Sequence, residues 1–273
     1  MAALIAFAAN SILCRKALGG AAIDAASFTA VRLASGAATL ALLARLARPA
    51  TRADSSGSWL SGLALFVYAA AFSFAYLRLQ TGMGALLLFA AVQGTMIGWG
   101  LKGGERLRAS EWLGFTLAAA GFVALTLPGT NAPDLTGAVL MTAAGLSWGV
   151  YSLRGRGEAH ALAATAANFA RSLPLAGLLA LAGVPQLHAA GRGILLAALS
   201  GSVASGIGYS LWYGALKGLS ATRASVVQLA VPVLAAAGGV VFLGERLTPR
   251  LALGGAVVLI GIALANVGGK LRR

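Results

Sequence analysis

Three amide side chains stand in the middle of long apolar runs of this chain: Asn10, Gln93 and Gln228. An amide in hydrocarbon must find a hydrogen-bond partner, and a neighbouring helix or a bound solute can supply one. Both interpretations stay open for each amide. We include all three among the residues expected to bind a solute.

Aromatic residues recur in the apolar runs with the spacing of one helix face. The groups are Tyr68, Phe72 and Tyr76; Trp148 and Tyr151; and Tyr209, Trp212 and Tyr213. Spacings of three and four residues place side chains on the same side of a helix. Such stripes form ordinary packing or interfacial belts, or else the wall of a site, since Tyr and Trp combine an apolar body with a polar tip. We expect all eight to line a solute site.

Four basic residues lie within or at the rim of the apolar runs: Arg15, Lys16, Arg32 and Arg171. A cation in a membrane is costly unless it faces water, a cavity or the interface. Each of the four therefore either extends to the lipid headgroups or holds the carboxylate of an anionic or zwitterionic solute. We place Lys16 in the expected solute site.

Acidic residues are scarce, and every one maps to a loop or a helix end. They are Asp24, Asp54, Glu105, Glu111, Asp134, Glu158 and Glu245. The two histidines, His160 and His188, also map to loops. The sequence thus predicts no proton relay of Asp, Glu or His inside a membrane and no convergent catalytic or metal-binding cluster. We expect a protein that is not an enzyme, with no cofactor and no metal.

Composition assigns the chain to the membrane class. It is 59% hydrophobic and 10% charged, whereas soluble domains are about a quarter charged. The net charge of +14 comes from basic residues scattered singly or in small groups between apolar runs, unlike the basic faces of nucleic-acid-binding proteins. A single cysteine, Cys14, excludes an internal disulfide. We therefore expect one transmembrane domain over residues 1–273, in contact with lipid and with no nucleic-acid partner.

Ten apolar runs are long enough to cross a bilayer, which takes about 20 helical residues. They cover about 2–22, 26–46, 58–78, 82–101, 110–128, 135–153, 161–183, 193–216, 222–243 and 250–268. Ten spans place both termini on one side, where the loops and tail carry twelve Lys and Arg residues against six on the other. Excess positive charge marks the cytoplasmic side. We expect cytoplasmic termini and residence in the plasma (inner) membrane.

The tetrapeptide GERL occurs twice, at 104–107 and at 244–247, 140 residues apart. The same shift aligns Leu113-Gly114 with Leu253-Gly254, and Gly121 with Gly261. Two repeats of five helices each, over residues 1–129 and 134–273, explain this pattern. An odd number of helices inverts the second copy, as in many transporters. For the glutamate of each copy the alternatives are a capped interfacial turn and a gate.

The segments around the two GERL copies resemble the two EamA repeats of the drug/metabolite transporter superfamily. They read "TGMGALLLFAAVQGTMIGWGLKGGERLRASEWLGFTLAAAGFVAL" and "SATRASVVQLAVPVLAAAGGVVFLGERLTPRLALGGAVVLIGIAL". The second copy matches more closely, because the first has Val92 where the second has Pro232. The resemblance implies ten helices, cytoplasmic termini and a central cavity lined mainly by the first, third, fourth, sixth, eighth and ninth helices. The YddG-like exporters of aromatic amino acids are the nearest functional group it suggests.

Taken together, the residues and the resemblance predict an all-α membrane protein of ten transmembrane helices in two inverted repeats. We expect an alternating-access carrier that exports small amphipathic metabolites, foremost aromatic or hydrophobic amino acids, as a uniporter without proton coupling. We expect a monomer, with an oligomer as the alternative. A nucleotide-sugar or phosphate-ester antiporter of the same superfamily is the alternative within this class. A passive channel and a membrane-embedded lipid-modifying enzyme are the alternatives from other classes.

Overall fold

The computed structural model describes residues 1–47, 57–104, 109–127, 132–155, 158, 160–184, 187–216 and 228–268. Within these, the side chains of 213–216 and 266–268 are outside the description. The regular elements of the described part are helices, with one isolated pairing between Ile23 and Ala189.

Ten helical rods follow one another along the described residues, and their bounds agree with the ten predicted runs. They are α1 (Ala2–Gly19), α2 (Ala25–Leu46), α3 (Trp59–Tyr76), α4 (Thr81–Lys102), α5 (Ala109–Thr126), α6 (Leu135–Arg154), α7 (Ala161–Ala182), a rod made of α8 (Gly191–Leu199), η2 (Ser200–Ile207) and α9 (Gly208–Leu216), α11 (Ala230–Leu243) and α12 (Pro249–Gly268). The prediction of 222–243 for the ninth run begins outside the described residues, which resume at 228.

Six of these rods are long and apolar enough to cross a membrane by length and composition alone: α1, α2, α3, α4, α5 and the α8–η2–α9 rod. Two shorter apolar helices, Ala230–Leu243 and Pro249–Ala265, lie in the last part of the chain. Helices α6 and α7 carry more polar side chains, and several of these, such as Asn168 and Ser172, are buried against other helices. The all-helical membrane architecture is confirmed.

Two helices begin at carboxylate caps that the sequence supplies. The carboxylate of Asp24 accepts from the backbone N–H of Ser27 at the start of α2 (2.8 Å). Asp134 does the same for Gly137 at the start of α6 (2.8 Å). A side-chain oxygen in this position satisfies one of the N–H groups that a helix leaves unpaired in its first turn. Two of the seven carboxylates are thereby accounted for as caps.

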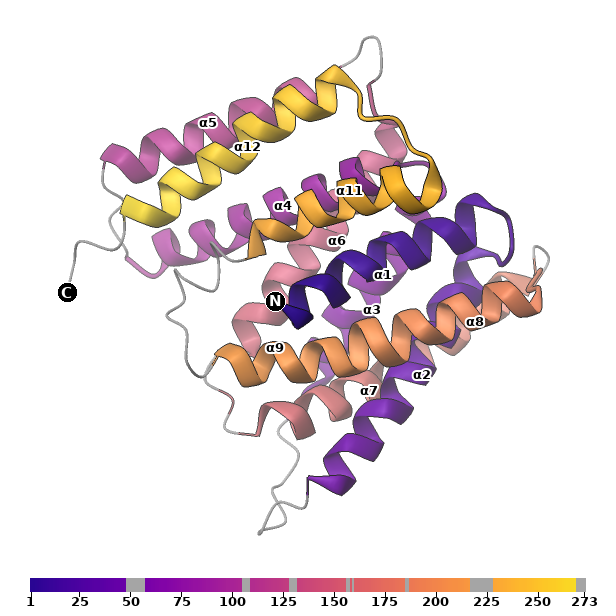
Figure 1. Cartoon of the computed structure of the whole chain (residues 1–273). Helices are drawn as coiled ribbons and strands as arrows, with labels where there is room; N and C mark the ends of the chain where they lie inside the picture. Colours follow the sequence, from indigo (N-terminus) through magenta and orange to yellow (C-terminus); the bar gives the residue numbers. More distant parts are fainter. Residues whose placement is uncertain are drawn as a thin grey trace.

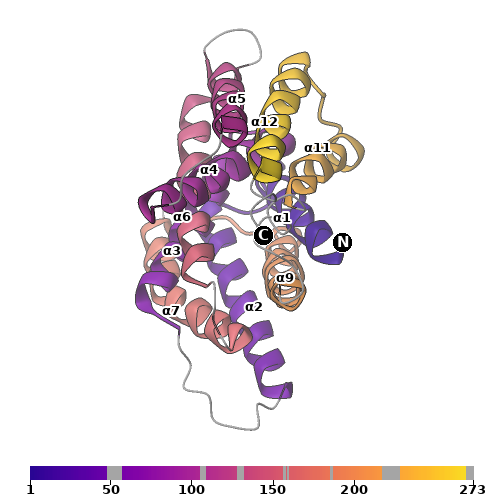
Figure 2. The ribbon, with the colours of Figure 1, turned by 90° about the vertical axis from the view of Figure 1, so that its left-hand side faces the viewer.

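The rods form two groups with α1 and α6 between them (Figures 1 and 2). Helices α4, α5, α11 and α12 lie on one side, and α2, α3, α7 and the α8–α9 rod lie on the other. Helix α1 packs against α11 and against the η2 segment, while α6 packs against α4 and α3. The two middle helices therefore connect both groups.

Glycine allows a close helix crossing between the antiparallel helices α5 and α12. A Cβ atom at Gly114 would lie 2.6 Å from the carbonyl oxygen of Gly261, and one at Gly261 would lie 2.7 Å from the carbonyl oxygen of Gly114. Neither position accommodates a side chain without moving the backbones apart. Small residues at such crossings are typical of helices that associate in lipid.

One end of the molecule is held together by polar contacts between its loops, and we call it the tied end; it comprises residues 20–24, 77–80, 132–134, 187–190 and 244–248. The backbone N–H of Asp24 donates to the carbonyl of His188 (2.9 Å), and Ala190 donates to Ala22 (2.8 Å). Arg78 pairs with Asp134 across two loops (3.4 Å). The opposite end carries the start of α1, the end of α6 and the end of α12, and we call it the pocket end.

Candidate substrate-binding site

An aromatic cluster runs through the centre of the described structure. Its members are Phe7 of α1, Tyr68, Phe72 and Tyr76 of α3, Trp148 and Tyr151 of α6, Phe169 of α7, and Tyr209 and Trp212 of α9. Trp148 is the hub, with ring centroids 4.9 Å from both Tyr68 and Tyr209 and 5.5 Å from Tyr151. Side chains from both halves of the chain thus build a single wall of rings.

Helical spacing explains why these rings meet. Tyr68, Phe72 and Tyr76 occupy one face of α3 and contact one another in sequence, at 5.5 Å and 4.7 Å between centroids. Opposite them, Phe7 of α1 lies 5.8 Å from both Tyr209 and Trp212. The rings are tilted or edge-to-face, the arrangements that the aromatic quadrupole favours.

Arg32 is the charged group of this region, and its side chain is only 2% exposed. Its guanidinium carbon lies 5.1 Å from the ring centre of Tyr68 and 5.0 Å from that of Phe72. The alternative in which Arg32 extends to the lipid headgroups is therefore wrong. Cation–π contacts of this kind stabilise a buried guanidinium, but they leave its net charge in place.

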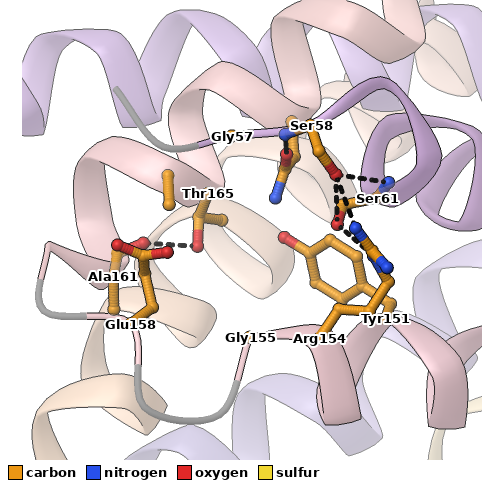
Figure 3. A pocket seen from close by; sticks show the side chains of 11 residues that line it. Gly57, Ser58, Ser61, Tyr151, Arg154, Gly155, Glu158, Ala161 and Thr165 are labelled. Atoms are coloured by element: carbon orange, nitrogen blue, oxygen red, sulfur yellow. Dashed lines mark hydrogen bonds between the residues drawn. The ribbon is translucent and has the colours of Figure 1, made fainter. Parts of the chain in front are cut away.

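A polar pocket of about 80 Å³ opens at the pocket end, between the start of α3, the end of α6 and the start of α7 (Figure 3). Arg154 donates to Ser61 Oγ (3.0 Å) and to Ser58 Oγ (3.2 Å), and Asn168 Oδ1 accepts from the backbone of Ser58 (2.9 Å). Tyr151 lines the same pocket and also stacks on Trp148. Tyr151 therefore belongs both to the polar pocket and to the aromatic cluster.

Glu245, the glutamate of the second GERL copy, caps a helix of the other half of the chain. Its carboxylate accepts from the backbone N–H of Thr81 (2.8 Å) and from Thr81 Oγ1 (3.0 Å), at the first residue of α4. It also lies 3.5 Å from Arg15 Nε, and Arg15 donates to the carbonyl of Tyr76 at the end of α3 (2.8 Å). Glu245 thus accepts a backbone N–H bond, as expected of a cap, but at the start of the distant helix α4 and not at its own turn. Glu105, of the first copy, lies outside the described residues.

The structure brings most of the predicted site residues together. Eight of the twelve belong to or touch the aromatic cluster: Asn10, Tyr68, Phe72, Tyr76, Trp148, Tyr151, Tyr209 and Trp212. Gln93 is buried but lines a different, apolar pocket of about 270 Å³ between α4, α5, α6 and α12. Lys16 is half-buried towards the end of α1, and Gln228 is buried just before α11. The side chain of Tyr213 is outside the description.

Four residues of the site were not predicted: Phe7, Phe169, Ser200 and Ser205. Phe7 lies three residues before Asn10 on α1, so the shared helix face could have identified it. The serines belong to η2, a π-helical segment whose Ser205 Oγ donates to the carbonyl five residues earlier (2.9 Å). Sequence periodicity does not reveal a π-helix, although such segments are frequent at functional sites.

Comparisons with known proteins agree with this architecture. The model of the EamA-like transporter family matches residues 135–267. The chain is 56% identical over 263 residues to a Pseudomonas aeruginosa protein described as "Uncharacterized protein PA1977", and the match covers 96% of this chain and 91% of the relative. A solved crystal structure with 25% sequence identity superposes with a TM-score of 0.66 and covers 97% of each chain. This helical integral membrane protein belongs to the EamA-like transporter family, within the drug/metabolite transporter superfamily.

Proposed function

We propose that the protein is an alternating-access carrier that exports small amphipathic metabolites, foremost aromatic and hydrophobic amino acids. The observation that carries this proposal is the aromatic cluster, in which α1 and α3 contribute rings from one half of the chain and α6, α7 and α9 from the other. Carrier sites lie between the two halves of a transporter, near the middle of the membrane. Rings with a few polar groups suit a solute that has an apolar and a polar part.

We further propose that residues 1–129 and 134–273 are inverted repeats, and the packing supports this. If the two halves are exchanged, the contact between α4 and α6 corresponds to a contact between α11 and α1. The contact between α3 and α6 likewise corresponds to one between the α8–α9 rod and α1. All four contacts are present. Among the described residues, the glycines with positive φ are Gly104 (+85°) and Gly244 (+65°), the first residue of each GERL copy. Related halves give a carrier two equivalent arrangements, one open to each side.

Polar contacts at the tied end support a state in which α1, α4 and the α11–α12 turn are held together there. Glu245, Thr81 and Arg15 supply these contacts. At the pocket end, Arg154, Asn168 and Tyr151 line the polar pocket of about 80 Å³. With both termini in the cytoplasm, as the distribution of Lys and Arg favours, this pocket faces the cytoplasm.

Counterflow in proteoliposomes tests the function. Vesicles loaded with unlabelled solute are diluted into trace labelled solute, in separate assays for aromatic amino acids, aliphatic amino acids, sugars and nucleotide sugars. We expect saturable counterflow of aromatic and hydrophobic amino acids. A response to sugars or nucleotide sugars alone would contradict the proposal, and equilibration without saturation would indicate a channel.

Coupling is tested in the same vesicles. We propose uniport, because no acidic residue belongs to the aromatic cluster or contacts Arg32 in the described residues. Solute should then never exceed its equilibrium distribution, with or without an imposed step of pH or sodium. Accumulation driven by a pH step alone would show proton coupling, and Lys16→Gln would test whether Lys16 carries the proton.

A further inference from the structure

Hydrogen bonds close a ring around the buried end of Arg32, inside the membrane-spanning part of the protein. Arg32 Nη2 donates to the hydroxyl of Tyr68 (3.1 Å), and Arg32 Nε donates to Ser205 Oγ (3.4 Å). Ser205 donates to the carbonyl of Ser200 (2.9 Å), whose hydroxyl donates to Asn10 Oδ1 (2.5 Å). Asn10 Nδ2 donates back to Tyr68 (3.4 Å). Helices α1, α2, α3 and η2 each contribute to this polar ring.

The polar ring leaves one strong donor unused. Arg32 Nη1 is buried and has no hydrogen-bond partner in the described part of the protein. A guanidinium has five N–H donors, and a buried charged donor without an acceptor is unfavourable. Tyr68 accepts from two groups, so its own O–H proton can donate to a third. Two donors, Arg32 Nη1 and the Tyr68 hydroxyl, are therefore available at the aromatic cluster.

The charge of Arg32 is also uncompensated. The ion pairs in the described structure join Arg15 to Glu245 and Arg78 to Asp134, and neither involves Arg32. The η2 segment packs directly against the backbone of Arg32, because a Cβ atom at Gly201 would collide with the carbonyl oxygen of Arg32. A buried cation without a protein counter-ion is unfavourable, and an anionic ligand would compensate its charge.

We propose that Arg32, through Nη1 and together with the Tyr68 hydroxyl, binds the carboxylate of the transported solute. This rests on the proposed function and specifies which solutes the carrier accepts: those with one carboxylate attached to an aromatic or apolar group. The apolar group lies against Trp148 and Tyr209, whose centroids are 4.9 Å apart. Because the rings already touch one another, they must separate to admit the solute.

The charge count favours a carboxylate over a phosphate ester. Arg32 contributes one positive charge, and one carboxylate neutralises it. A phosphate monoester carries a charge of about −1.5 to −2 and would leave an excess of negative charge. An amine without a carboxylate would place a second positive charge beside Arg32 and is excluded.

The test compares four competitors of L-phenylalanine counterflow in wild-type proteoliposomes: 3-phenylpropanoate, L-phenylalanine methyl ester, phenethylamine and phenyl phosphate. We expect 3-phenylpropanoate to compete within a few-fold of phenylalanine, and the other three to compete at least about 10-fold more weakly. Equal competition by the methyl ester would overturn the carboxylate assignment. Stronger competition by phenyl phosphate would overturn it in favour of a phosphate ester.

Variants of Arg32 and Tyr68 test which side chains donate to the carboxylate of the solute. Arg32→Gln should raise the half-saturating phenylalanine concentration about 30-fold, the effect of losing a charge-assisted hydrogen bond, and should remove the preference for acid over ester. Arg32→Lys keeps the charge without the planar group and should be intermediate, and Tyr68→Phe should raise the concentration several-fold with the charge retained. Arg192→Gln, which removes an equal charge from an exposed residue at the start of α8, should match the wild type.

The two proposals fail in different ways. If the wild-type protein carries no phenylalanine or other amino acid, the proposed function is wrong. If it carries phenylalanine and Arg32→Gln keeps both the affinity and the preference for acid over ester, the role of Arg32 is wrong while the function stands. If Arg32→Gln does not fold, the wild-type competition series and Tyr68→Phe decide the assignment.

Discussion

Replacement of Glu245 by glutamine should release the tied end of the protein. The carboxylate of Glu245 is 13% exposed, caps α4 through Thr81 at 2.8 Å and 3.0 Å, and lies 3.5 Å from Arg15. Glutamine is nearly isosteric and can still accept a hydrogen bond from Thr81. It removes the charge that strengthens both the cap and the contact with Arg15, so the change isolates electrostatics from packing.

The expected size follows from these contacts. A hydrogen bond to a charged group contributes about 1.5–3 kcal/mol, against about 0.5–1.5 kcal/mol for a neutral one, and a negative charge at a helix N-terminus adds about 0.3–1 kcal/mol. The difference amounts to about 2 kcal/mol in favour of the closed arrangement. Its loss should increase the population in which the tied end is open about 30-fold.

Cys14 provides a built-in probe of this opening. It is the one cysteine of the chain, its side chain is 0% exposed, and it precedes Arg15 on α1. When opening is fast relative to modification, the rate of alkylation is proportional to the open population. Alkylation by a membrane-impermeant maleimide, in vesicles of known orientation, should therefore be about 30-fold faster in Glu245→Gln than in the wild type, from the side that the tied end faces.

Arg78→Gln is the matched control, because it breaks the Arg78–Asp134 contact at the same end, where both side chains are well exposed (51% and 40%). Exposed ion pairs contribute little, so its alkylation rate should equal that of the wild type. Cys14→Ser should not be modified at all. An unchanged rate in folded Glu245→Gln, or an equal increase in Arg78→Gln, would refute the role of Glu245 in closing this end.

Two further predictions concern packing and pH. Gly114→Val should destabilise the α5–α12 crossing by about 1–3 kcal/mol, because its Cβ atom would meet the backbone of Gly261. The melting temperature in detergent should fall accordingly. In the control Gly98→Ala, a Cβ atom meets nothing within 4 Å, so the melting temperature should be unchanged or slightly raised. Burial would raise the pKa of Asp24, but hydrogen bonds from the N–H groups of Ser27 and His188 hold this pKa below its usual range. Because the pKa of Asp24 is lower in the folded state, its ionised carboxylate stabilises the fold at pH values above the unfolded pKa of about 3.9. This stabilisation is lost as the pH falls through the folded-state pKa. Asp24→Ala should therefore cost about 1 kcal/mol at pH 7 and progressively less in acid, whereas a pH-independent difference would contradict this.

The helices were predictable from the sequence because hydrocarbon permits few alternatives. A chain that crosses a bilayer must satisfy its backbone internally, so long apolar runs become helices and breaks between runs become turns. The predicted run 161–183 and the helix Ala161–Ala182 differ by one residue. The π-helical turns of η2 were not predictable, because nothing in the local pattern of "SGSVASGI" distinguishes them from an α-helix; in the structure the segment packs against α1 and α2.

The aromatic part of the site was predictable for the same reason. The rings on one face of α3 point in one direction. They contact Trp148 because α6, which carries it, packs beside α3. Arg32 was harder, since a sequence does not show whether a long side chain bends towards the headgroups or towards the core. Contacts with Tyr68 and Phe72 decide that it turns inward, and such contacts depend on tertiary structure.

The positions of Arg32 and Glu245 connect the proposed solute site to the contacts of the tied end. Tyr76 belongs to the aromatic cluster through Phe72, at 4.7 Å between centroids, and its backbone carbonyl accepts from Arg15 (2.8 Å), the partner of Glu245. The end of α3 thus connects the rings around Arg32 to the contacts of the tied end. A solute whose carboxylate binds Arg32 and Tyr68 contacts α3 directly, and a shift of α3 would change the contact between its carbonyl at Tyr76 and Arg15, the partner of Glu245. Saturating phenylalanine should therefore change the alkylation rate of Cys14 in the wild type, and should change it much less in Arg32→Gln at the same concentration.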